Sequence, residues 1–254
     1  MLFAILAALP LAGPLVTAPP TQEIAVRDNR PEVATLAKQF RIKLMTKNGE
    51  GDEEALADFN SLVRMWKRLG PKDRKEVLKR ADGAFKVKRK PLEDGVVNDR
   101  LFLGLAESLA QCGPESADLL MSWIGHKRFR ENNALQRRLI LSLGETQVPD
   151  GAEFLIDLLT HEEPIVQGAA AEALGEYRDA SEEIRKEAFE GILKQIVPLH
   201  NETLNAPVDP TQQQRYDIIS APMVTTLQRL SKHTETDPPQ WQHWWNKNKK
   251  LTWE

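Results

Sequence analysis

Apolar residues recur at helical spacing along most of the chain. Between residues 33 and 44 they stand at positions i, i+3, i+4, i+7 and i+11, one face of a helix: Val33, Leu36, Ala37, Phe40 and Leu44. No sustained alternation of apolar and polar residues is bounded by hairpin turns. The sequence therefore predicts an all-α protein, with further helices over 56–69, 72–82, 97–112, 115–125, 131–144, 151–160, 164–177, 181–197, 214–231 and 238–248.

The middle of the chain repeats itself. Leu109, Leu143 and Leu174 align at spacings of 34 and 31 residues, and the positions three, four and eight residues earlier are apolar each time: Ala106, Ile140, Ala171, Leu105, Leu139, Ala170, Leu101, Leu135 and Val166. A register on Gly113, Gly144 and Gly175 gives a spacing of 31 twice but matches fewer apolar positions. Repeats of this length are typical of helical solenoids, in which each helical pair buries its face against the next.

The stretch PIVQGAAAEALGEY, residues 164–177, combines a proline suited to a first helical turn with three consecutive alanines. Small side chains of this kind allow a helix to pack closely between two neighbours. The stretch resembles the second helix of the HEAT-repeat family at these positions: Pro164, Val166, Ala170, Ala171, Ala173, Leu174 and Gly175. Gln167 stands where that family usually has an arginine. The resemblance implies an α-solenoid of antiparallel helix pairs whose second helices line a concave surface that binds other macromolecules.

The composition divides the chain into four parts. Residues 1–20 carry no charge and are almost wholly apolar, as expected for a signal peptide or an N-terminal anchor. HEAT-like repeats are predicted over 21–197, a proline-containing linker over 198–213 and capping C-terminal helices over 214–254. We therefore expect an exported protein, periplasmic or secreted. The absence of an early Lys or Arg and the proline at position 19 leave membrane anchoring open.

Charge and motifs narrow the candidate chemistry. The net charge of −3 gives no case for nucleic-acid binding, although residues 72–90 carry nine basic and three acidic residues. Residues 151–200 carry eleven acidic and four basic residues. The basic and the acidic segment each form either a binding face or a solvated helix surface. The five histidines have no metal-ligand spacing, and no nucleotide-binding or nucleophile motif occurs. We predict no catalytic residue, metal or cofactor.

Candidate binding residues come from two places. Arg137 and Arg138 are expected on a second helix, where they project into a groove or pair with acidic residues of the adjacent repeat. Gln167 belongs to the next second helix. Trp241, Trp244 and Trp245 share one face of the last predicted helix, either as a cap on the final repeat or as an exposed binding patch.

Two functions are compatible with these features. The first is a non-catalytic, exported scaffold or adaptor that binds a protein partner of unknown identity. The alternative is a HEAT-like enzyme, or a ligand- or nucleic-acid-binding protein, that uses an aromatic and basic groove. The basic stretch FKVKRKP, residues 85–91, supports that alternative, or contact with anionic lipid, unless it is a solvated loop. The sequence leaves the oligomeric state open.

Overall fold

The computed structural model describes residues 26–204 and 209–253. These residues form helices and connecting segments, and their one β-type pairing is an isolated bridge between Arg27 and Leu69. The prediction of an all-α protein is confirmed. The α-helices are α1 Pro31–Leu44, α2 Asp52–Arg64, α3 Pro71–Phe85, α4 Arg100–Ala110, α5 Ala117–Trp123, α6 Asn133–Thr146, α7 Pro149–Leu158, α8 Pro164–Leu174, α9 Glu182–Leu204, α10 Pro210–Ser231 and α11 Pro238–Asn248.

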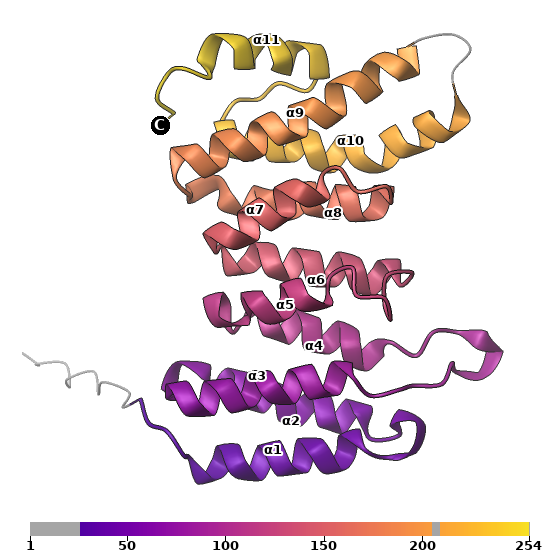
Figure 1. Cartoon of the computed structure of the whole chain (residues 1–254), viewed down its shortest axis with the longest axis vertical. Helices are drawn as coiled ribbons and strands as arrows, with labels where there is room; N and C mark the ends of the chain where they lie inside the picture. Colours follow the sequence, from indigo (N-terminus) through magenta and orange to yellow (C-terminus); the bar gives the residue numbers. More distant parts are fainter. Residues whose placement is uncertain (1–25, 205–208, 254) are drawn as a thin grey trace, which may run out of the picture.

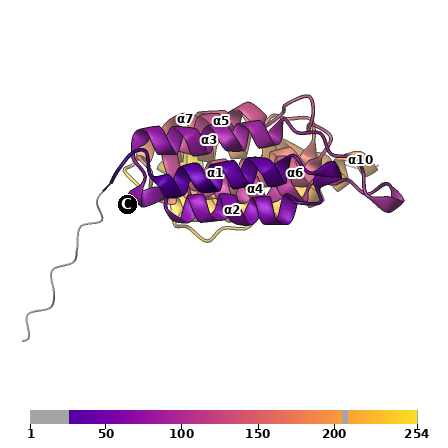
Figure 2. The same ribbon diagram turned by 90° about the horizontal axis from the view of Figure 1, so that it is seen from below.

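The helices stack into an elongated solenoid of two layers (Figure 1). The second helices α2, α4, α6, α8 and α10 each pack against the next one in that series. In the other layer α7 contacts both α5 and α9, and α11 lies beyond α9. Figure 2 shows α3, α5 and α7 along one side of the stack. Each layer is thus built from alternate helices, as the repeat predicts.

Local sequence signals set where the helices begin. Six of the eleven, α1, α3, α7, α8, α10 and α11, start at a proline, whose missing N–H has no partner in a first turn anyway. The Asn132 side chain accepts a hydrogen bond from the Leu135 N–H and caps α6. Asp209 caps α10 in the same way through the Thr211 N–H, at 2.8 Å.

The twelve apolar positions of the predicted register are all buried, with exposures of 3% or less. They belong to α4, α6 and α8 and form part of one continuous core. α6 and α8 approach closely at Gly144, because a Cβ built there would lie 2.7 Å from the carbonyl oxygen of Ala173. The alanines of α8 therefore fill narrow space between neighbouring helices.

The connection between α9 and α10 is shorter than the predicted linker over 198–213. α9 continues through Pro198 to Leu204, and α10 begins at Pro210. Proline removes a helical hydrogen bond, but the turn after it is held by tertiary packing. Leu199 is buried, and His200 Nδ1 lies 3.0 Å from the hydroxyl of Tyr216 on α10. These contacts keep the last turn of α9 helical.

The tryptophans of α11 pack onto α9. Trp241 is fully buried, Trp245 is 6% exposed, and both rings lie against Phe189, with centroid distances of 5.6 and 5.2 Å. Trp244 is half-buried and also contacts Phe189. Trp253, near the end of the chain, completes the cluster on the same phenylalanine. α11 thereby covers the apolar face that α9 would otherwise expose at the end of the stack.

Candidate functional site

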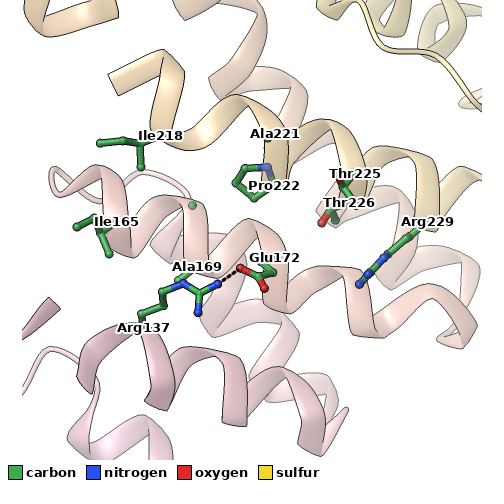
Figure 3. A pocket seen from close by; sticks show the side chains of 11 residues that line it. Arg137, Ile165, Ala169, Glu172, Ile218, Ala221, Pro222, Thr225, Thr226 and Arg229 are labelled. Carbon is green, nitrogen blue, oxygen red and sulfur yellow. Dashed lines mark hydrogen bonds and ion pairs between the residues drawn. The ribbon is translucent and has the colours of Figure 1, made fainter. Parts of the chain in front are cut away.

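A groove of about 550 Å³ lies on the second-helix layer, between α8 and α10, with one residue contributed by α6. Figure 3 shows its side chains converging from the three helices. The residues that line this second-helix groove are Arg137, Ile165, Gly168, Ala169, Glu172, Ile218, Ala221, Pro222, Thr225, Thr226 and Arg229. It lies on successive second helices, the layer in which the resemblance to HEAT repeats implies a binding surface.

The floor of the groove is made of small residues. Gly168 and Ala169 come from α8, and Ala221 and Pro222 face them from α10 (Figure 3). A Cβ at Gly168 would lie 3.5 Å from the carbonyl oxygen of Ile218, so the two helices are in ordinary contact there. Pro222 has no N–H to donate to that carbonyl, four residues earlier in α10. The floor is thus apolar, with one carbonyl acceptor that lacks its usual helical donor.

Two exposed ion pairs border the groove. Arg137 of α6 pairs with Glu172 of α8 at 2.6 Å, and their side chains are 48% and 43% exposed. Arg229 of α10 pairs with Glu176 at 3.3 Å. Exposed pairs of this kind contribute only about 0.2–1 kcal/mol, so an incoming charged group exchanges with either partner at little cost. The groove therefore offers both signs of charge around an apolar floor.

The other two candidates from α6 and α8 have structural roles. Arg138 pairs at 3.0 Å with Glu145 of its own helix and does not line the groove. Gln167 is only 1% exposed. Its amide Nε2 donates to the Leu159 carbonyl at 2.7 Å, and its Oε1 accepts from Arg215 of α10 at 2.8 Å. Gln167 thus joins α10 to the turn before α8 from beneath the surface.

Gln136 occupies the equivalent buried position in α6, 31 residues before Gln167. Its Oε1 accepts from the Gly125 N–H at 2.7 Å, and its Nε2 donates to the Phe129 carbonyl at 3.2 Å. Each glutamine therefore bonds at least one backbone group of the turn that leads into its own helix. This role explains a buried polar side chain at the position where HEAT repeats usually place arginine.

Sequence reasoning found one side of the groove and missed the other. Arg137 was among the candidates, but Glu172, Pro222 and Arg229 were not. The available signal was Pro222, because a proline in the interior of a helix is unfavourable and its presence there calls for a local structural explanation. The contact between α8 and α10 could not be predicted from the repeat spacing, because α8 belongs to the repeated segment of the sequence and α10 does not.

The titratable groups of the described residues include neither a metal-type cluster nor an exposed thiol. Over residues 26–204 and 209–253, no cluster of three or more His, Cys, Asp or Glu side chains could hold a metal ion. Cys112 is 1% exposed, and burial raises the pKa of its thiol to about 12, so the thiolate is scarce at neutral pH. His200 lies between Tyr216 and Asp237, with Nε2 3.8 Å from the Asp237 carboxylate. This last grouping joins α9, α10 and the start of α11.

In the part of the chain that the structure describes, no helix is long and apolar enough to cross a membrane. The predicted leader, residues 1–20, lies outside the described residues.

Comparison with known proteins matches residues 127–193 to the family of HEAT repeats. The matched segment contains α6, α7, α8 and the first half of α9, which include the groove wall on α8. A search of curated proteins finds no match to the chain. Residues 127–193 are thus similar to HEAT repeats, and they lie within an all-helical solenoid of HEAT-like helix pairs closed by a tryptophan-rich C-terminal helix.

Proposed function

We propose that this chain is a non-catalytic scaffold that binds a segment of another protein in the second-helix groove. The observation that carries the proposal is the open, small-residue floor between α8 and α10, bordered by the two exposed ion pairs. Ile218 is 37% exposed at the edge of this floor, which provides an apolar contact for a partner. HEAT repeats commonly serve as protein-interaction scaffolds, which supports this reading of the matched segment.

The groove suits a partner segment that presents an apolar side chain flanked by charged ones. The apolar residue would cover Ile165, Ala221 and Ile218, which favours binding by roughly 25 cal/mol per Å² of apolar surface removed from water. The flanking charges would replace one partner in the Arg137–Glu172 or Arg229–Glu176 pair. Burial provides affinity, and the two pairs provide orientation.

Site-specific photocrosslinking tests the proposal. A photoreactive residue replaces Thr225, which is exposed in the groove, and a control carries it at Lys79, which is exposed on α3 in the other layer. We expect one protein to be joined through position 225 and not through position 79. Equal adducts from both positions would contradict a groove-specific partner.

A second variant separates the groove from the fold. Ala221→Trp fills the groove from an exposed position of α10, and Ala57→Trp places the same ring on an exposed position of α2. With both proteins folded, measured by far-ultraviolet circular dichroism, the Ala221→Trp variant should bind the purified partner at least about tenfold more weakly, a change of roughly 1.4 kcal/mol. Equal affinity of the two variants would place the binding surface elsewhere.

We also propose that the protein is exported, on the basis of the apolar, charge-free residues 1–20. A reporter fused after residue 30 should reach the cell envelope or the medium. A reporter that stays soluble in the cytoplasm would contradict export, without bearing on the groove.

A further inference from the structure

The exposed apolar side chains gather near one edge of the solenoid. Nine large apolar side chains are exposed among the described residues, and five of them lie in the last turn of α1, just after it, or in the loop between α3 and α4. These five are Ile42, Met45, Leu92, Val96 and Val97. Single exposed apolar residues need no explanation, but a group of them on one feature usually marks a binding surface.

The loop between α3 and α4 holds three of the five on a tight turn. The Leu92 N–H donates to the Val96 carbonyl at 2.8 Å, and Gly95 adopts a positive φ of 74° inside the turn. Leu92, Val96 and Val97 are 54%, 57% and 62% exposed. The turn projects beyond the ends of the neighbouring helices (Figures 1 and 2). The apolar side chains therefore stand on a convex protrusion.

The base of the protrusion is fixed to the helical stack. Arg89 donates two hydrogen bonds to the Asp52 carboxylate, at 2.6 and 2.7 Å, and a third to the Leu44 carbonyl at 2.8 Å. Arg128, from the loop before α6, donates to the carbonyls of Phe85 and Val87. Its guanidinium also stacks 4.9 Å from the Phe129 ring. The connecting loops of three successive repeats are thus joined at this edge.

Those three loops carry a net positive charge. Residues 45–51, 86–98 and 124–132 together carry eight basic and four acidic residues, in a chain whose net charge is −3. Lys88, Lys90 and Lys127 are exposed there. We call these three loops the basic edge. Glu93 is exposed on the turn between Leu92 and Val96, so the lysines flank the protrusion at its base and not at its tip.

We propose that the basic edge binds the surface of an anionic lipid bilayer, with Leu92, Val96 and Val97 entering the interface between headgroups and acyl chains. The choice of a lipid surface rests on the pairing of exposed apolar side chains with exposed lysines in the same loop. Lysines at the base of the protrusion attract anionic headgroups, and apolar side chains provide the contact that charge alone does not. The second-helix groove lies on other helices, so this proposal stands independently of the proposed function.

Environment-sensitive fluorescence tests the proposal at the residue level. The full chain carries a single introduced cysteine, Val97→Cys, labelled under native conditions with a polarity-sensitive dye. The native Cys112 is buried and reacts slowly in the fold. The matched control is Leu204→Cys, since Leu204 is 69% exposed and lies outside the basic edge. Vesicles contain either phosphatidylcholine alone or equal parts of phosphatidylcholine and phosphatidylglycerol.

We expect a blue shift of the dye at position 97 with the anionic vesicles only, no shift at position 204, and reversal at high salt. Because the readout is local, binding through the apolar leader would not produce this difference. No shift at position 97 with anionic vesicles, or equal shifts at both positions, would overturn the proposal. A larger shift at position 97 with DNA than with vesicles would overturn the choice of lipid.

Charge reversal provides the second arm. Lys88→Glu with Lys90→Glu should lower the partition onto anionic vesicles at least about tenfold, because two cations beside the protrusion become anions. Lys72→Glu with Lys75→Glu makes the same charge change at exposed positions of α3 and should have a smaller effect. An equal loss from both pairs would show that bulk charge, and not this edge, controls binding.

Discussion

Replacement of Gly144 by alanine tests how tightly the second-helix layer is packed. In an isolated helix this change stabilises by about 0.8–1.0 kcal/mol, since glycine is the poorer helix former. Here the added Cβ would lie 2.7 Å from the carbonyl oxygen of Ala173 and 2.8 Å from its Cβ. Non-bonded carbons prefer separations of about 3.5–4.0 Å. α6 and α8 must therefore move apart by roughly 0.7 Å, at backbone atoms that cannot rotate away.

The expected magnitude follows from the difference of the two effects. Overpacking a core by one methyl group costs about 1–3 kcal/mol, and the upper part of that range applies when the neighbour is backbone. After the gain in helix propensity is subtracted, the Gly144→Ala chain should be less stable by about 1–2 kcal/mol. Loss of stability from a change that favours the helix itself would be the sign of close interhelical contact.

Urea denaturation followed by far-ultraviolet circular dichroism measures the effect as a lower midpoint at unchanged slope. Gly83→Ala is the matched control, because Gly83 lies in α3 with nothing within 4 Å of the added Cβ. That variant should be as stable as the parent or more stable, by up to about 1 kcal/mol. Ala173→Gly should reduce the cost of Gly144→Ala, since it removes one of the two clashing groups. A Gly144→Ala chain at least as stable as the parent would refute the reasoning.

Three further predictions concern the core. Trp245→Ala should lower stability by about 3–5 kcal/mol, because its ring is buried against Phe189; an unchanged urea midpoint would show that α11 does not cap the stack. Ala170→Leu should destabilise by about 1–3 kcal/mol and more than Ala171→Ser, and equal melting temperatures would contradict close packing at this face. Cys112 should react with thiol reagents much more slowly in the folded chain than in the unfolded one. Burial raises the pKa of the Cys112 thiol to about 12 from an unfolded value of about 8.5, so the free energy of unfolding should decrease as the pH rises between these two values. The Cys112→Ala variant should lack this decrease. A Cys112→Ala chain whose stability falls with pH as the parent's does would refute the prediction.

The repeated core was predictable from the sequence because burial in a solenoid follows a local period. The positions of Leu109, Leu143 and Leu174 were found from spacing alone, and all three are fully buried. The stretch over residues 85–91 shows where such reasoning fails. It reads as one basic segment, yet Phe85 is in the core and Arg89 is buried with Asp52, while the lysines between them stay exposed. Contacts with residues far away in the sequence determine which of these side chains are buried and which are exposed.

The candidate site was less predictable for the same reason. Arg137 could be placed on a second helix from its period, and its pair with Glu172 of the next repeat agrees with one of its two predicted roles, but the sequence did not single out Glu172. Gln167 was expected near a binding surface, and its side chain instead joins Arg215, 48 residues later. Phe189, on which the tryptophan cluster rests, had no signal beyond being apolar. Side-chain pairing across repeats depends on the exact offset between helices, which a periodic pattern does not specify.

If the second-helix groove binds a partner segment as proposed, the contacts between α8 and α10 bear on how fast that complex forms. Arg215 holds one end of α10 through Gln167 and the His161 carbonyl, and the Thr226 hydroxyl donates to the Ala171 carbonyl at 2.7 Å further along. Both walls of the groove are therefore set before any ligand arrives. Conformational entropy lost on association then falls mainly on the partner segment, so encounter and orientation, and not opening of the receptor, would limit how fast a complex forms.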